Sequence, residues 1–152
     1  MMRSLTHRKC RPEDYPQIRS LLEHESLPYS DVGKSPVDFH FFYKDQTLVG
    51  LSGLEELGTR GLIRSVLVKD EHKGKGLGKE ITGITQQIAL DKDIEVLYLL
   101  TNDADPFFEK MGYQVISRGE VPEPVKATAE FQELCPDSAI CMSKDLRLEI
   151  QG

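Results

Sequence analysis

Residues 63–91 constrain the fold most, because an apolar run, a turn with three glycines and a helical pattern follow one another directly. The apolar run Ile63–Val68 is short, contains β-branched residues and is followed by charges at residues 69–71, which predicts a mostly buried strand. Four apolar side chains then recur at helical spacing: Leu77, Ile81, Ile84 and Ile88. We therefore expect a buried strand that passes through a tight turn into a helix beginning at about Gly78.

The turn has the composition of an anion-binding site. Gly74, Gly76 and Gly78 lack a Cβ atom, so the backbone can turn sharply and bring several N–H groups close to one external atom. Free N–H groups at a helix start and the positive end of the helix dipole favour a phosphate. Three lysines add positive charge, although the net charge of the chain is −6: Lys73, Lys75 and Lys79. The turn therefore predicts a phosphate cradle, and a solvated glycine turn without a ligand is the alternative.

Two well-known phosphate loops do not fit these residues. A Walker loop needs glycine at position 73 and Ser or Thr at position 80, where the chain has Lys73 and Glu80. A dinucleotide fingerprint that starts at Gly74 or Gly76 needs Gly or Ala at position 79 or 81, where the chain has Lys79 and Ile81. These residues therefore exclude both a Walker loop and a dinucleotide-binding fingerprint at this turn.

The turn resembles the acyl-coenzyme A loop of the GCN5-related N-acetyltransferases (GNAT). That loop has Arg or Gln, two residues, Gly, one residue, then Gly or Ala, and residues 73–78 match it except for Lys73 at the first position. Lysine keeps the positive charge but loses the forked donor of arginine. Residues 104–113, ADPFFEKMGY, resemble the family pattern A-x-x-F-Y-x-x-x-G-F, with Phe108 in place of tyrosine. Words such as GLE at 53–55 and LCPDSAICM at 134–142 are similar to the arsenic-resistance branch, and the resemblance runs from about Leu5 to Leu146.

The resemblance implies a fold and an activity. We expect one α/β domain of the GNAT (acyl-CoA N-acyltransferase) fold over residues 1–152, with a mixed, mostly antiparallel sheet, a parallel splayed strand pair and flanking helices. Acetyl-CoA is the implied cosubstrate, without a metal, and the acceptor is the amine of a small amino-acid-like molecule, with an arsenical among the candidates. Acetylation of a protein or peptide amine and a non-catalytic CoA sensor are the alternatives. Family members are often dimers, so a homodimer is a further expectation.

The family also implies which residues bind the cofactor. The pantetheine arm is expected to lie along Val66, Leu67 and Val68, and its thioester end to approach Asn102 and Phe107. The pyrophosphate is expected on the residues of the turn: Lys73, Gly74, Lys75, Gly76, Leu77, Gly78 and Lys79.

Acyl transfer to an amine needs a base, because an alkyl amine has a pKa of about 10 and must lose a proton before it attacks. Glu55 is the predicted base, since it ends the strand beside the cradle strand, and Glu56 is the second choice; a solvated charge is the alternative for both. Arg64 is predicted either to bind a substrate carboxylate or arsenic-acid group or to pair with a neighbour in the sheet. Phe108 cannot donate a proton, so the thiolate is expected to leave unassisted.

Arg118 and Glu130 are further candidates for the pocket.

Composition limits which partners the protein can bind and where in the cell it is expected. A pI near 5.2 argues against nucleic acid, which requires a basic face. No apolar stretch approaches the roughly 20 residues of a membrane span, and residues 1–10 lack the apolar core of a signal peptide. Three cysteines without metal-site spacing suit a reducing compartment, so a cytoplasmic location is expected.

Periodicity and turn residues predict the remaining elements. Strands are expected at 5–10, 37–43, 48–54, 62–68, 94–100, 114–117 and 139–144, and helices at 12–24, from 78, at 105–111 and at 123–134. Asp105 is expected to cap the third helix with Pro106 at its first position, and Gly112 to end it. This order predicts an antiparallel first half followed by one strand–helix–strand crossover.

Overall fold

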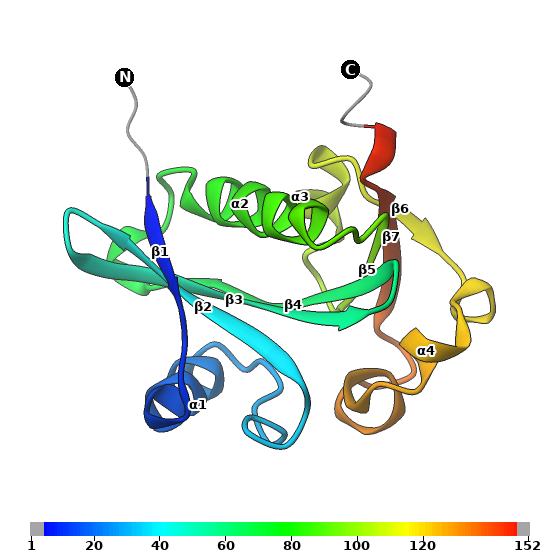
Figure 1. The fold of residues 1–152 in the computed structure, drawn as a ribbon, viewed down its shortest axis with the longest axis horizontal. Coiled ribbons are helices and arrows are strands. Elements are labelled where there is room, and N and C mark those ends of the chain that lie inside the picture. The colour runs from blue at the N-terminus through cyan, green and yellow to red at the C-terminus, as the bar shows by residue number, and fades with distance from the viewer. Residues whose placement is uncertain (1–4, 149–152) are drawn as a thin grey trace.

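The computed structural model describes residues 5–148, which form a seven-stranded sheet with helices on both faces (Figure 1). The elements in chain order are β1 (Thr6–Lys9), α1 (Tyr15–His24), β2 (Val37–Lys44), β3 (Thr47–Leu57), β4 (Arg60–Val68), α2 (Leu77–Asp91), β5 (Val96–Thr101), α3 (Asp105–Lys110), β6 (Gln114–Ile116), α4 (Glu123–Lys126) and β7 (Ile140–Asp145). The described residues contain no helix that is long and apolar enough to cross a membrane.

The sheet has the predicted mixed topology. Its strand order is β1-β2-β3-β4-β5-β7-β6, with antiparallel pairs everywhere except between β4 and β5. The chain reaches β5 from β4 through α2, because a parallel neighbour needs a crossover connection. The meander followed by one strand–helix–strand unit is therefore confirmed.

Two apolar layers enclose the sheet. Helices α2 and α3 cover one face, whereas α1 and α4 lie on the other (Figure 1). On the first face Leu54 and Ile63 belong to the same core cluster as Ala89 of α2. On the second face Leu51 and Leu67 pack in a cluster with Ile18 of α1. Residues of β3 and β4 thus contribute to both helical layers. Ile63 and Leu67 are four residues apart but belong to opposite layers, because the regular alternation of β4 is interrupted between them.

The central parallel pair separates part-way along its length. Strands β4 and β5 pair at Arg60–Val96, Gly61–Leu97 and Leu62–Tyr98, and the pairing ends there although β4 continues to Val68. On the other side of β4 the register with β3 shifts between Leu51 and Gly53. Ser65 adopts a left-handed φ of 61° at this irregularity. A bulge of this kind bends a strand, and we attribute the divergence of β4 from β5 to it.

Three predicted element details are wrong. The helix expected at 123–134 divides into α4, which ends at Lys126, and a π-helical turn at Glu130–Leu134. The hydroxyl of Thr128 donates to the carbonyl of Val125 (2.8 Å), which offers the backbone a local partner and ends α4. Helix α1 begins only at Tyr15, after a 3₁₀ turn at Pro12–Asp14.

The third detail is the cap of α3. Ala104, not Asp105, is the N-cap, and the Ala104 N–H donates to the Thr101 hydroxyl (2.9 Å). Because the Thr101 hydroxyl accepts this hydrogen bond at Ala104, the helix begins one residue earlier than predicted, with Asp105 as its first residue and Pro106 as its second. Gly112 follows the C-cap Met111 with a φ of 95°, as expected for a glycine that ends a helix.

Candidate functional site

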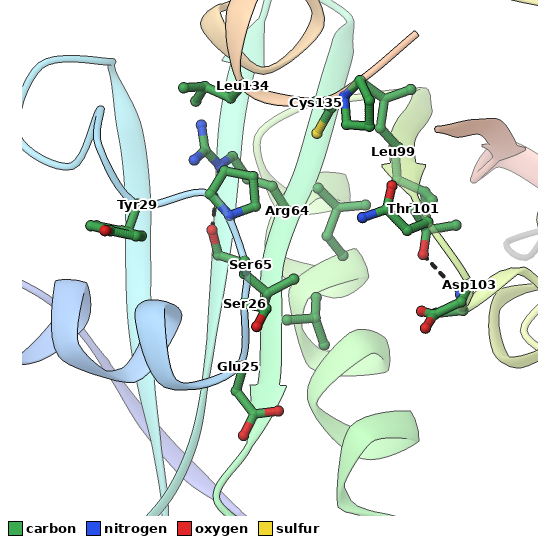
Figure 2. A pocket seen from close by; sticks show the side chains of 18 of the residues that line it. Glu25, Ser26, Tyr29, Arg64, Ser65, Leu99, Thr101, Asp103, Leu134 and Cys135 are labelled. Carbon is green, nitrogen blue, oxygen red and sulfur yellow. Dashed lines mark hydrogen bonds between the residues drawn. The ribbon is translucent and has the colours of Figure 1, made fainter. Parts of the chain in front are cut away.

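A cleft of about 650 Å³ opens where β4 and β5 separate (Figure 2). Four segments far apart in the sequence supply its walls, together with Phe108: 25–30 after α1, 63–66 of β4, 99–104 from the end of β5, and 134–136 from the end of the π-helical turn. The cleft forms because β4 and β5 do not pair beyond Leu62 and Tyr98, so no hydrogen bonds between the two strands close this space.

The glycine turn lies between the carboxyl end of β4 and the start of α2. Gly74 and Gly76 have φ angles of 81° and 79°, a left-handed conformation that favours glycine, and Gly76 is the N-cap of α2. A Cβ atom added at either position would meet nothing within 4 Å. The turn is therefore open to an external group, and its N–H groups at the start of a 15-residue helix suit an anion.

The three lysines of the turn differ in their surroundings. Lys75 and Lys79 are exposed. The Lys73 ammonium forms salt bridges with Glu25 and Asp70, each at 2.9 Å. Hydrogen bonds to these two carboxylates raise the pKa of Lys73. The Asp70 carboxylate also lies 2.7 Å from Nε2 of His24, so this residue group ties the turn to the end of α1.

The other predicted cofactor residues fall into three groups. Val66 and Asn102 line the cleft. Leu67 and Leu77 are buried in core clusters, so only their backbone groups can serve a ligand. The remaining three lie close to the turn: Val68, Gly78 and Phe107, since a Cβ at Gly78 would be 3.5 Å from the Phe107 ring and 3.8 Å from Val68. These cofactor roles remain predictions.

Arg64 lies in a buried cluster of charged groups. Its terminal nitrogens donate to both carboxylate oxygens of Asp31 at 2.7 and 2.8 Å, and its Nε lies 3.1 Å from Glu130. Only 1% of its side chain is exposed. Arg64 thus pairs inside the protein, but with a residue of the loop after α1 and a residue of the π-helical turn rather than with the predicted neighbour in the sheet. A substrate carboxylate at this guanidinium would have to share it with Asp31 and Glu130.

Three carboxyl groups share this one guanidinium. Burial tends to raise the pKa of Asp31, but hydrogen bonds from Arg64 and Ser35 outweigh it and the pKa lies below its ordinary value. Burial raises the pKa of Glu130 to about 7, against the attraction of Arg64. Burial likewise raises the pKa of Glu55, whose Oε1 has no hydrogen-bond partner among the described residues. Asp31 is therefore the ionised partner of Arg64, whereas burial favours the protonated forms of Glu130 and Glu55.

Glu55 lies beneath the cleft rather than in its wall. It is 4% exposed and is not among the residues that line the cleft. Glu56, the second choice, is exposed and lies 4.0 Å from Lys92. A base at Glu55 would therefore need a water to relay the proton from the amine. Its catalytic role remains a prediction.

The aromatic end of the cleft offers no acid. Phe108 lines the cleft and stacks edge-on against Tyr113, with ring centroids 5.5 Å apart. The Tyr113 hydroxyl is buried and donates to Gln86 Oε1 (2.9 Å). Phe108 stands at the position of the tyrosine in the family pattern, and Tyr29, from the segment after α1, is the tyrosine among the described residues that line the cleft.

Some residues of this region had no signal in the sequence. Asp31 occupies a loop of mixed composition, and nothing near it indicates a partner 33 residues away. Ser65 has a backbone conformation that usually favours glycine, so a serine at this position did not indicate the bulge. Glu130 was a candidate for the pocket, but it and Arg118 lie outside the cleft wall; Arg118 donates to the Pro136 carbonyl (2.7 Å).

A family comparison matches this geometry. The model of the acetyltransferase (GNAT) domain matches residues 36–115, from β2 to β6. The chain belongs to this family. The GNAT fold, with its parallel β4–β5 pair between helices, is therefore confirmed. A comparison with curated proteins finds no match.

Solved structures share the fold at low sequence identity. N-acetylglutamate synthase from Neisseria gonorrhoeae, complexed with coenzyme A and N-acetyl-glutamate, has a TM-score of 0.78 at 20% identity over 96% of this chain. This chain spans 36% of that one. A GNAT acetyltransferase from Staphylococcus aureus has a TM-score of 0.72 at 18% identity, with 94% and 99% of the two chains covered. PaiA N-acetyltransferase from Thermoplasma acidophilum, in complex with coenzyme A, has a TM-score of 0.65 at 17% identity, with 94% and 99% covered.

Proposed function

We propose that the chain is an acetyl-CoA-dependent N-acetyltransferase that acetylates the amine of a small molecule. The observation that carries this proposal is the open, left-handed glycine turn next to the cleft between β4 and β5. The pyrophosphate binds the N–H groups from Gly74 to Lys79, and the pantetheine arm enters between the separated strands. The GNAT family and neighbours solved with coenzyme A support this placement.

The reaction joins the amine to the thioester carbon. The nitrogen attacks the carbonyl carbon, an N–C bond forms, and the C–S bond breaks to release the thiolate of CoA. Glu55 accepts the proton of the amine through a water. The thiolate takes its proton from solvent, because Phe108 has no hydroxyl group.

The contacts of Arg64 bear on the identity of the acceptor. The resemblance implies an amino-acid-like molecule, with an arsenical among the candidates, and Arg64 was the residue predicted to bind its acidic group. Arg64 is bound to Asp31 and lies beside Glu130. The proposed acceptor is therefore the amine of a small molecule, and an amino-acid-like acceptor stays a prediction.

Two variants of the turn test the cofactor site. Asp and Asn have nearly the same shape, and both tolerate a left-handed φ better than other residues. We expect Gly76→Asp to lose CoA affinity by about 100-fold or more, because its carboxylate repels the pyrophosphate, whereas Gly76→Asn keeps most of it. Calorimetry with CoA and acetyl-CoA measures both.

Turnover tests the reaction itself. Thiol release from acetyl-CoA is followed with amines, amino acids, arsenical amino acids and a peptide with a free amine. Release that depends on an amine supports the proposed function. Tight CoA binding without release would instead favour a CoA sensor, and equal affinity in both Gly76 variants would contradict the cradle.

A further inference from the structure

Among the described residues that line the cleft, the basic side chain already has carboxylate partners. Of the residues from 5 to 148 that line it, Arg64 alone has a basic side chain, while Glu25 and Asp103 are acidic. Figure 2 shows Glu25 and Asp103 at one end of the cleft and the Arg64 side chain directed to the other end, near Leu134. Whatever binds beside Arg64 therefore meets a guanidinium that already has carboxylate partners.

The groups around Arg64 make this end of the cleft unfavourable for an anion. Asp31 accepts from both terminal nitrogens, and Glu130 lies 3.1 Å from Nε. Glu55 adds a third buried carboxyl group with an unpartnered oxygen among the described residues. A carboxylate brought here would lose its hydration and compete with Asp31 and Glu130 for Arg64, and both effects weaken binding.

The wall above this cluster is mostly neutral and partly apolar. Leu27, Pro28, Tyr29, Leu134 and Pro136 belong to it, and none of these side chains carries charge. An apolar or cationic group therefore fits where a second acidic group does not.

We infer that the acceptor is an amine without a carboxylate or other oxyanion beside its amino group. This inference rests on the proposed function and narrows its substrate class. Amines of the alkylamine, arylalkylamine or amino-acid-amide kind meet the requirement. Free amino acids and arsenic-acid analogues do not.

Matched amines test it on the wild-type protein. The pairs are tyramine and tyrosine, phenethylamine and phenylalanine, and phenylalaninamide and phenylalanine, whose members differ at the acidic group. We expect kcat/KM for the member without the carboxylate to be about tenfold or more higher in each productive pair. Equal or higher values for the amino acids would overturn the inference while leaving the proposed acetyltransferase intact.

A binding measurement keeps the test independent of turnover. The same pairs are titrated by calorimetry into protein saturated with CoA, which presents the acceptor site without the reaction. Preferential binding of the carboxylate-free member supports the inference even if acetyl transfer fails. Preferential binding of the amino acid, or binding of neither member in any pair, contradicts it.

A variant of the ion pair adds a directional test. Asp31→Asn removes one negative charge from Arg64 with little change in shape, so the preference against amino acids should shrink by about tenfold. Asp38→Asn removes a carboxylate outside the cleft, where Asp38 lies near Lys9 and Lys92, and should leave the preference unchanged. An unchanged preference in folded Asp31→Asn protein would count against the role of this cluster.

Discussion

Glu130 is an acid held in a place that suits its neutral form. Burial raises its pKa to about 7 from an ordinary value of 4.5. Below pH 4.5 the folded and unfolded chains both keep the proton. As the pH rises from about 4.5 to about 7, the unfolded chain releases it first, so this group makes the fold less stable with rising pH.

Glu130→Gln tests this sign. Glutamine does not titrate, so we expect the variant to gain thermal stability relative to wild type between pH 5 and pH 8, by about 1 kcal/mol or more. Thermal melting at several pH values measures the difference. The control is Glu133→Gln, an exposed residue of the same π-helical turn. Parallel stability curves for wild type and Glu130→Gln would show that the pKa is not raised.

Glu55 combines a buried carboxyl group, an oxygen without a described partner and a raised pKa. A base whose pKa moves toward neutrality is suited to take a proton from an ammonium group. We expect Glu55→Gln to lower kcat by about 100-fold or more while the Kd for CoA stays the same. Steady-state kinetics and calorimetry separate the two effects. Glu56→Gln, at an exposed position, is the control, and an unchanged kcat in Glu55→Gln would remove Glu55 from the mechanism.

At the scale of elements, the contact between β3 and α2 determines how closely the helix approaches the sheet. Gly50 of β3 leaves room for Ile81, and a Cβ there would lie 2.5 Å from both Ile81 Cδ1 and the Leu67 carbonyl oxygen. The Leu67 oxygen belongs to the backbone of β4 and cannot move aside like a flexible side chain. The close packing of α2 therefore depends on this glycine.

Gly50→Ala should destabilise the fold by about 2 kcal/mol or more, because the added methyl group overpacks this contact. Gly83→Ala places the same methyl group on α2 where nothing lies within 4 Å, and should stabilise the helix by about 0.5 to 1 kcal/mol. Denaturant unfolding gives both free energies. A neutral Gly50→Ala variant would mean that β3 and α2 separate easily.

Most elements could be predicted from local patterns, and the exceptions have a common cause. The apolar spacing from Leu77 predicted α2, and glycine at 112 predicted the end of α3. The break between α4 and the π-helical turn was missed because helix periodicity continues through it. The wide turn buries both Glu130 and Phe131, one beside Arg64 and the other in the core with Val125. Whether the chain continues as an α-helix or widens into a π-helical turn therefore depends on contacts with residues outside the segment.

The whole molecule is divided by the cleft, since β4 and β5 share only three paired positions. A ligand that spans the glycine turn and the cleft would connect the two halves of the sheet. Binding to the folded state alone raises stability with the logarithm of ligand concentration, by about 2.7 kcal/mol at 100 times the Kd.

We therefore expect CoA to raise the melting temperature of wild type in proportion to the logarithm of its concentration. Gly76→Asp should show no such rise, while Gly76→Asn should follow wild type. Thermal melting over a CoA series measures this. A flat response of wild type at CoA concentrations far above those expected for a cofactor would contradict binding across the cleft.

Patterns within a few residues were enough to predict the strand–turn–helix unit and the antiparallel first half of the sheet, and the resemblance of residues 73–78 and 104–113 to the GNAT motifs implied the fold. Backbone conformation, glycine freedom and apolar periodicity act locally, so neighbours in the chain encode them. The occupation of Arg64 by Asp31 and Glu130, the bulge at Ser65 and the depth of Glu55 were decided by the tertiary structure. These features depend on which distant groups meet and how much water the fold removes from them, and both the pairing of charges and the pKa values follow from that burial.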